Sequence, residues 1–306
     1  MDNYNLDNLF LSESMKDEIV KISKSNATLL ITGESGVGKE VVAKTVHELS
    51  SQSKKKAVII NVRAIPSELL EKELFGSIAG AFTDAKDDSI GMFQLADDST
   101  LILDDIGDIS MSIQGKLLNA IENGVIQPIG STTPIKVNCR IIAISTVPIP
   151  TLVEKGLFRR DLYYRLNVLS LEIPPLRDRV HQIGKITDYY LNTVSSLEKV
   201  FTIDNEAMSR LVWYNWPGNI RELLNTLERG TVMSDSHKIT SDYLLLSSDN
   251  NVNISNATLK DAVRLFKKRY ITQVLENNGW NVTKSSNFLG IQRTYLSRLI
   301  KEFNIE

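Results

Sequence analysis

The sequence has 306 residues, a length that allows about two to three domains with ample core. Apolar residues make up 42% and charged residues 24%, as is ordinary for a soluble globular protein, and the single cysteine, Cys139, excludes a disulfide framework. No stretch approaches the ~20 apolar residues of a membrane span, and the N-terminus has no signal region, so we expect a cytoplasmic protein without membrane association.

The net charge of −2 is divided unevenly along the chain. From Ser255 to Glu306, nine lysines and arginines stand against four acidic residues, so this segment carries +5 and the remainder −7. A small basic module attached to an acidic body is typical of a protein whose module binds a polyanion. A solvated helix face is the alternative explanation.

A phosphate-binding loop is the first motif along the chain. We expect an amphipathic helix over 7–24 and a strand over 27–32, and the loop that follows leads into a helix over 40–49. Such a turn directs backbone N–H groups to one point, where the helix N-terminus favours negative charge. A chance glycine-rich loop is the alternative. The residues that would bind the nucleotide are Gly33, Glu34, Ser35, Gly36, Val37, Gly38, Lys39, which would reach the terminal phosphates, and Glu40, which stands where a magnesium-binding Ser or Thr is usual.

Strands that alternate with helical segments predict an α/β fold, with a parallel sheet covered by helices on both faces. Beyond the first strand, we expect strands over 57–61, 100–104, 140–145 and 168–173, and a helix over 67–75. After Pro174 the pattern is wholly helical, and a stretch rich in Ser, Asp and Asn then indicates a linker. The predicted domains are an α/β domain over 1–173, an all-α subdomain over 174–246, a linker over 247–257 and a C-terminal module over 258–306.

Two acidic residues end the third predicted strand. Asp104 and Asp105 follow the apolar run Leu101 to Leu103, at the strand end where an open α/β sheet binds its ligands. Asp104 would orient hydrated Mg²⁺, and Asp105 would polarise an attacking water. A strand entering a solvated turn is the alternative, but the phosphate loop upstream favours a nucleotide site.

The C-terminal module has the pattern of a helix-turn-helix. Leu259, Val263, Phe266, Tyr270 and Val274 recur at helical spacing, and two shorter helices are expected over 283–289 and 292–303. The second of these would be available for the major groove of double-stranded DNA; a plain helical hairpin is the alternative. The expected DNA-binding residues are Gln292, Arg293, Thr294, Tyr295, Arg298 and Lys301, and the sequence does not assign Arg293 or Arg298 to phosphate or base.

Seven blocks, in this order, resemble the sigma-54-dependent transcriptional activators, a bacterial family of AAA+ ATPases also called enhancer-binding proteins. The blocks are 33–40, 73–76, 80–85, 103–107, 158–166, 174–177 and 216–223. The resemblance runs from about residue 8 to the C-terminus, so we expect no regulatory domain ahead of it. It also explains Glu40, because the family's P-loop ends in Gly-Lys-Glu. The C-terminal module resembles the factor-for-inversion-stimulation type, although Ser285 and Ser286 stand where two alanines are common.

The resemblance implies a ring, typically a hexamer, with ATP and Mg²⁺ held between subunits. Arg159 and Arg165 match the arginine fingers, and Arg221 matches the lid arginine called sensor II. Asn61 matches the asparagine that holds the catalytic carboxylate in some nucleotide states, and Thr146 occupies the sensor I position, where Asn is usual. Without that context, surface arginines and a turn asparagine are the alternatives.

Two departures from the family pattern bear on function. Asp105 replaces the usual catalytic Glu, and Asp84 replaces a glycine in the loop that contacts sigma-54. That loop is Gly80, Ala81, Phe82, Thr83, Asp84 and Ala85, of which Phe82 and Thr83 are expected to touch the partner.

Two hypotheses follow. In the first, the protein binds upstream activator DNA and assembles into a homo-oligomeric ring, or a hetero-oligomer with a related subunit. It then hydrolyses ATP to move the contact loop against sigma-54 RNA polymerase holoenzyme and open the promoter. In the second, it is a sigma-54-independent, nucleotide-gated DNA-binding regulator with weak or no ATPase activity.

Overall fold

The computed structural model describes residues 6–80, 87–196, 199–234, 237–244 and 278–303, together with 264, 267, 268, 270–272, 274, 275 and 305. Contacts divide the chain into a unit over Met1–Leu245 and a unit over Leu246–Glu306, each described by itself. The predicted linker over 247–257 and residues 81–85 of the predicted contact loop lie outside the described residues. Within the described part, no helix is both long and apolar enough to cross a membrane.

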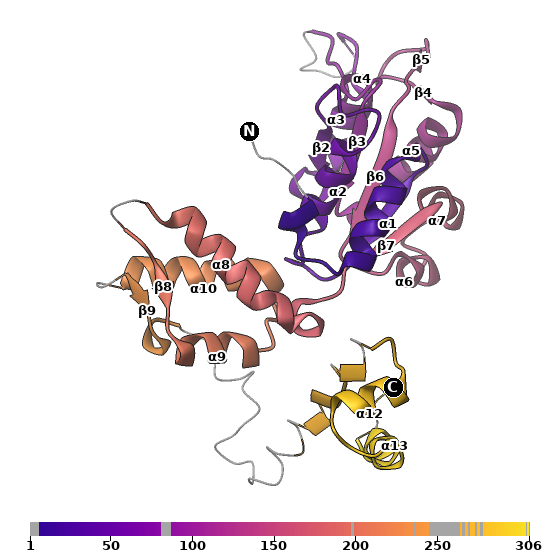
Figure 1. Ribbon diagram of the computed structural model, residues 1–306. Coiled ribbons are helices and arrows are strands. Elements are labelled where there is room, and N and C mark those ends of the chain that lie inside the picture. Colours follow the sequence, from indigo (N-terminus) through magenta and orange to yellow (C-terminus); the bar gives the residue numbers. More distant parts are fainter. Residues whose placement is uncertain are drawn as a thin grey trace. The chain divides into compact units, whose positions relative to one another are not determined.

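The first unit is built on a five-stranded parallel sheet in the order β2-β3-β6-β1-β7 (Figure 1). This confirms the predicted α/β fold, and four parallel pairings bring the carboxyl ends of all five strands to one edge. Two strands have the predicted bounds and three are one or two residues shorter. The strands are β1 (Leu29–Thr32), β2 (Val58–Asn61), β3 (Thr100–Asp104), β6 (Arg140–Ser145) and β7 (Leu169–Glu172).

Alternate side chains of the central strands enter two separate cores. Leu101 and Leu103 of β3 pack on the face that also buries side chains of α3, α5 and α7, whereas Ile102 packs on the face covered by α1 and α2. Burial on both faces is the reason why these strands are almost continuously apolar. The helices of this unit are α1 (Glu13–Ser23), α2 (Lys39–Glu48), α3 (Ser67–Phe75), α4 (Met92–Leu95), α5 (Met111–Asn123), α6 (Ile149–Glu154) and α7 (Arg160–Leu166).

Short elements depart from the sequence-based expectations. The single helix expected over 7–24 is a 3₁₀ turn, Leu6–Leu9, followed by α1, because Phe10 has a left-handed φ of 48° and interrupts it. A hairpin of β4 (Val125–Ile126) and β5 (Ile135–Lys136) was not predicted, since two-residue strands leave no periodicity. Further 3₁₀ turns are Val62–Ala64, Ile106–Asp108, Leu176–Asp178, Val180–Gln182 and Ser241–Tyr243.

The segment after Pro174 is mainly helical, as predicted, but not wholly so. It contains α8 (Ile183–Val194), α9 (Asn205–Trp213) and α10 (Asn219–Met233). A parallel pair joins β8 (Thr202–Ile203), which lies between α8 and α9, to β9 (Lys238–Ile239), which follows α10. This segment is called the lid below.

Trp216 anchors the turn that begins α10. Its side chain is fully buried, its indole Nε1 donates to the carbonyl of Leu211 at 2.8 Å, and its ring lies edge-on to Tyr214 at 4.9 Å between centroids. A buried indole contributes a large apolar contact area, and its N–H group needs an acceptor, which the Leu211 carbonyl supplies here. The turn that leads into α10 is therefore fixed by packing.

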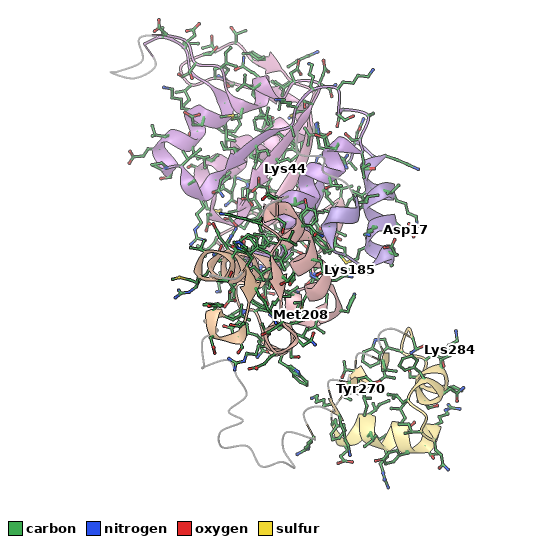
Figure 2. The ribbon with its side chains drawn as sticks, turned by 60° about the vertical axis from the view of Figure 1, so that its left-hand side comes forward. Asp17, Lys44, Lys185, Met208, Tyr270 and Lys284 are labelled. Carbon is green, nitrogen blue, oxygen red and sulfur yellow. The ribbon has the colours of Figure 1, made fainter. Side chains whose placement is uncertain are left out.

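The second unit contains the predicted helix-turn-helix. Helix α12 (Val282–Phe288) and helix α13 (Arg293–Glu302) are joined by a turn in which Gly290 has φ +65°. Ile271, Val274 and Leu275 are buried at i, i+3 and i+4. Tyr270, expected on the inner face, lies one position off this stripe and is 46% exposed; Figure 2 labels it with the exposed Lys284. Leu296 and Leu299 pack inward, as predicted.

Replacing Trp216 by Ala should lower the free energy of unfolding of the lid by about 3–5 kcal/mol, because the substitution leaves a large cavity and an unpaired carbonyl. Val232→Ala, in α10, is the control: that side chain is 76% exposed, and its loss should cost less than about 1 kcal/mol. Urea titration followed by circular dichroism measures both, and equal losses would contradict the packing role of Trp216.

Candidate functional site

The loop Gly33–Lys39 wraps around the ammonium group of its own lysine. Lys39 Nζ donates to the carbonyls of Gly33 and Glu34, each at 2.8 Å, and to Thr146 Oγ1 at 3.3 Å. Gly36 (φ +78°) and Gly38 (φ +102°) adopt the left-handed backbone that the curl requires. Burial lowers the pKa of Lys39, while Asp105 and Asp104 act in the opposite direction. The loop is therefore preformed around a cation.

Two carboxylates lie beside this loop, at the carboxyl end of β3. Asp104 Oδ1 accepts from the backbone N–H of Asp105 at 3.0 Å, and Asp105 Oδ1 accepts from Thr146 Oγ1 at 2.8 Å. Since Thr146 also contacts Lys39, its hydroxyl bridges the lysine and the second carboxylate. Burial, and then the neighbouring Asp105, raise the pKa of Asp104. The short hydroxyl at position 146 thus reaches both partners.

Asn61 contacts a different carboxylate from the one that the resemblance implies. Its Nδ2 donates to Asp104 Oδ2 at 3.0 Å rather than to Asp105. The cause is the strand register, which pairs Asn61 at the end of β2 directly with Asp104 at the end of β3. Asn61 is nevertheless part of the same cluster of polar side chains.

The side chains near the phosphate loop determine which metal ion the site could bind. Within the described residues, no group of three His, Cys, Asp or Glu side chains can hold a metal ion. Glu40, in the place of the usual Ser or Thr, forms an ion pair with Lys44 at 2.6 Å and is half exposed. A lone carboxylate such as Asp104 fits Mg²⁺, which keeps most of its waters and takes its other ligands from phosphates.

The lid closes one side of the phosphate loop. Arg221 Nη1 donates to Ser35 Oγ at 3.0 Å, and the backbone N–H groups of Ile220 and Arg221 donate to the Gly36 carbonyl at 3.0 and 3.3 Å. A Cβ added at Gly36 would lie 2.3 Å from the carbonyl oxygen of Gly218. Position 36 therefore requires glycine for two reasons: its φ is positive, and a Cβ would collide with the Gly218 carbonyl.

Three lid residues that sequence reasoning gave no role also hold the loop. Arg177 forms a bidentate ion pair with Glu34 at 2.6 and 2.8 Å, and Asn219 Nδ2 donates to Glu34 Oε2 and the Ser35 carbonyl. Arg179 is buried, donates to the Val37 carbonyl at 2.7 Å, and has its pKa lowered to about 10 by burial. Arg177 and Asn219 lie within the recognised blocks, which was their one sequence signal, whereas Arg179 lies two residues beyond the block 174–177.

The two candidate arginine fingers make their hydrogen bonds outside the phosphate loop. Arg159 pairs with Asp161 at 2.7 Å, and its backbone N–H is held by the buried Gln114 side chain. Arg165 donates to the Ile121 carbonyl at 3.3 Å, at the amino ends of the strands. Within the described part of the chain, neither arginine hydrogen-bonds a residue of the phosphate loop.

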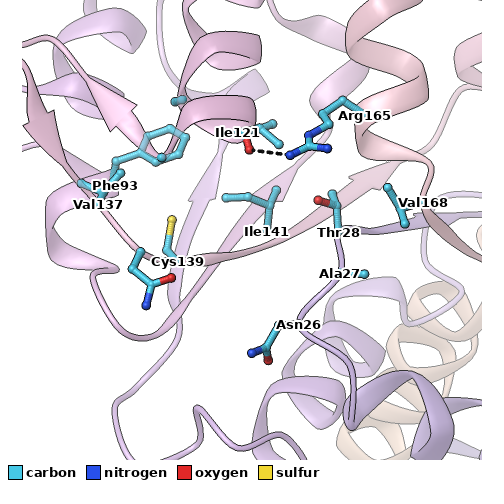
Figure 3. Close-up of a pocket in the computed structure, with 13 residues that line it drawn as sticks. Asn26, Ala27, Thr28, Phe93, Ile121, Val137, Cys139, Ile141, Arg165 and Val168 are labelled. Atoms are coloured by element: carbon cyan, nitrogen blue, oxygen red, sulfur yellow. Dashed lines mark hydrogen bonds between the residues drawn. The ribbon is translucent and has the colours of Figure 1, made fainter.

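Arg165 borders a cavity of about 310 Å³ at this opposite end of the sheet (Figure 3). The cavity is also lined by Thr28, which precedes β1, and by Cys139, which precedes β6. Burial, and to a smaller extent Asp97, raise the pKa of the Cys139 thiol to about 12. The thiol is therefore protonated at neutral pH.

The predicted DNA-binding residues share the exposed side of α13 and the turn before it. Arg298 lies over the ring of Tyr295, with 5.1 Å between the guanidinium carbon and the ring centroid. All six predicted residues are exposed: Gln292, Arg293, Thr294, Tyr295, Arg298 and Lys301. Of the predicted sigma-54 contact loop, the structure describes Gly80 alone.

Family models match three successive segments of the chain. The Sigma-54 interaction domain matches residues 10–172, more than half of the chain. The chain belongs to the sigma-54 interaction domain family. In this family member, the AAA+ ATPase lid domain matches residues 177–259, and the bacterial regulatory protein, Fis family, matches residues 262–303.

Several regulators resemble this member of the sigma-54 interaction domain family. The Nif-specific regulatory protein of Azotobacter vinelandii is 38% identical over 301 residues, covering 94% of this chain and 56% of that protein. Regulatory protein AtoC of Escherichia coli K12 is 38% identical over 300 residues, covering 94% and 65%. The chain thus spans less than two thirds of the length of these relatives.

The same similarity extends to solved structures. A crystal structure of NtrX from Brucella abortus in complex with ADP is similar to this chain, with a TM-score of 0.73 and 28% identity over 95% of this chain and 68% of that one. A structure of NtrX in complex with ATP has a TM-score of 0.70 at the same identity and coverage. The sequence, the fold and the preformed phosphate loop agree on a nucleotide-binding domain of the AAA+ type.

Gly36→Ala should abolish the docking of α10 on the phosphate loop, because the added methyl meets the Gly218 carbonyl and a φ of +78° strains the backbone. We expect the affinity for a fluorescent ADP analogue to fall at least about tenfold, since positioning groups contribute on that scale. Gly184→Ala is the control, because no atom lies within 4 Å of its added methyl. Unchanged affinity in Gly36→Ala would contradict the close approach.

The Cys139 thiol should react with a disulfide reagent at pH 8 about 10³-fold more slowly than an ordinary thiol, because a pKa of about 12 leaves little thiolate. Its rate should rise with pH towards that value. In guanidinium chloride the one cysteine of the chain should react at the ordinary rate. A native rate equal to that of free cysteine would show that the thiol is not buried.

Proposed function

We propose that this protein is a DNA-bound transcriptional activator that couples ATP hydrolysis in an AAA+ ring to the remodelling of sigma-54 RNA polymerase holoenzyme. The observation that carries the proposal is the cluster of Lys39, Thr146, Asp105, Asp104 and Asn61 beside a preformed phosphate loop, within a chain of the sigma-54 interaction domain family. The Fis-family module supplies the proposed contact with double-stranded DNA.

The chemistry of the site supports ATP hydrolysis. The Lys39 ammonium would hold the terminal phosphates, and Asp105 would accept the proton of the attacking water. Mg²⁺, oriented by Asp104, would neutralise charge that develops on the phosphates. Thr146 keeps Asp105 next to Lys39 through two hydrogen bonds, one with each residue.

The position of the arginines supports a ring of several copies. Arg165 lies with Thr28 at the amino end of β1, whereas the phosphate loop begins at its carboxyl end. The four residues of this strand span about 13 Å, so Arg165 does not serve the loop of its own chain. We propose that Arg159 and Arg165 of a neighbouring copy, or of a related subunit, stabilise the transition-state charge.

The contact with sigma-54 is assigned to Gly80–Ala85 by resemblance. Phe82 and Thr83 would touch the partner, and ATP hydrolysis would move this loop. Asp84 adds a negative charge to the contact, which would favour a basic counterpart on sigma-54. On DNA, Arg293, Arg298 and Lys301 would meet phosphates or base edges in an upstream activator site.

Promoter opening tests this function most directly. The protein, sigma-54 holoenzyme and a closed promoter are mixed with ATP or a non-hydrolysable analogue, and the melted strand is detected by permanganate. We expect the protein to open the promoter with ATP and not with the analogue. Lys39→Ala should not open it with either nucleotide, because it loses the phosphate-binding cation, but it should keep DNA binding through the C-terminal module. DNA binding without ATP-dependent opening would refute the proposal and favour a nucleotide-gated, sigma-54-independent regulator.

A further inference from the structure

The phosphate loop carries a negative charge of its own. Glu34 is its second residue, and the carbonyl of Glu34 lies 2.8 Å from the Lys39 ammonium that would bind phosphate. The carboxylate of Glu34 adds a negative charge to this loop, which lowers the positive potential that would attract a polyphosphate unless a cation neutralises that carboxylate. Within the described chain, the cation that pairs with Glu34 is Arg177, which belongs to the lid.

The Glu34–Arg177 pair has the geometry of a strong ion pair. Two parallel hydrogen bonds join Arg177 Nη1 to Glu34 Oε2 at 2.8 Å and Arg177 Nη2 to Oε1 at 2.6 Å. The hydrogen bonds from Arg177, and then from Asn219, lower the pKa of Glu34 to about 2. The carboxylate is therefore ionised, and the contribution of this pair to stability is complete above pH 4.5 and is lost as the pH falls towards 2.

Asn219 fixes the pair in place. It is fully buried, and its backbone is left-handed with φ +56°. Its Nδ2 group donates to Glu34 Oε2 at 3.1 Å and to the Ser35 carbonyl at 3.0 Å, while its Oδ1 accepts from the Leu176 N–H at 2.7 Å. One amide thus joins the phosphate loop, the residue next to Arg177 and the start of α10.

We propose that Arg177 and Asn219 are positioning residues of the nucleotide site: they neutralise Glu34 and bind the phosphate loop to the lid, so that the loop accepts a polyphosphate only while the lid is docked. This inference rests on the proposed function, and it adds a direct link between nucleotide affinity and lid docking. Arg221 contacts Ser35 from the same helix and is held in register by the same docking.

The charge role is tested by the affinity of the full chain for a fluorescent ADP analogue. Arg177→Met should weaken binding about tenfold or more, because Glu34 is then uncompensated, whereas Arg177→Lys, which keeps the charge, should stay within about threefold. Glu34→Gln should also stay within about threefold, and the double variant Glu34→Gln/Arg177→Met should regain most of the loss. Arg210→Met breaks an exposed lid ion pair with Glu206 and should leave affinity unchanged.

These variants distinguish a role of Arg177 in neutralising Glu34 from a purely structural role. Recovery in the double variant cannot come from a merely structural role, because that variant removes more contacts than Arg177→Met. If the double variant binds as weakly as Arg177→Met, or if Arg177→Lys loses as much, the proposal is overturned. Failure of the unmodified protein to bind the analogue would instead refute the proposed function, whereas normal binding with unaffected variants would refute only this inference.

The docking role is tested by hydrogen exchange without nucleotide. The amides of Ile220 and Arg221 donate to the Gly36 carbonyl and report whether α10 is docked. Both Arg177→Met and Asn219→Gly should speed their exchange; glycine is chosen because it keeps the left-handed backbone at position 219. Arg177 is partly exposed, so its variant should fold even if Asn219→Gly does not. Unchanged exchange in Arg177→Met would overturn the docking role.

Discussion

Parallel pairing of the five central strands is the constraint on which the candidate site depends. It brings the ends of β1, β2, β3 and β6 to one edge, so that residues far apart in the sequence become neighbours. The strand register then decides which of them touch, as it does for Asn61 and Asp104. Burial of both faces of the sheet keeps this register fixed, because a slip by one residue would exchange the two cores.

The phosphate loop is not supported by the sheet alone. The backbone carbonyls of Gly33 and Glu34 accept hydrogen bonds from Lys39. The carbonyls of Ser35, Gly36 and Val37 accept hydrogen bonds from lid residues. The Glu34 side chain forms an ion pair with Arg177. Buried carbonyls need hydrogen-bond partners, so a loop whose own N–H groups are directed towards a ligand must find donors elsewhere. The lid provides them, and this couples the shape of the loop to the position of the lid.

One positive charge, on Lys39, and two negative charges, on Asp104 and Asp105, lie side by side in the candidate site. Burial disfavours both the Lys39 ammonium and the Asp104 carboxylate. The ammonium is stabilised by Asp105 and Asp104, whereas the Asp104 carboxylate is opposed by Asp105 and is stabilised first by the Asp105 backbone N–H and then by Lys39. Arg159 and Arg165 would add further positive charge only when another copy supplies them. In the proposed ring, the complete electrostatic environment of a nucleotide would therefore exist only between subunits.

The sequence by itself determined the fold class, the strands of the sheet and the outward face of α13, because apolar periodicity and glycine-rich turns are local signals. It also indicated Lys39, Asp104 and Asp105 as neighbours, since each lies at or just beyond the carboxyl end of a predicted parallel strand. The tertiary structure alone decided that Asn61 bonds Asp104, that Thr146 bridges Lys39 and Asp105, and that Arg177 and Asn219 hold Glu34. These contacts join residues separated by 41 to 185 positions, and strand register and lid docking, which no local pattern encodes, bring them together.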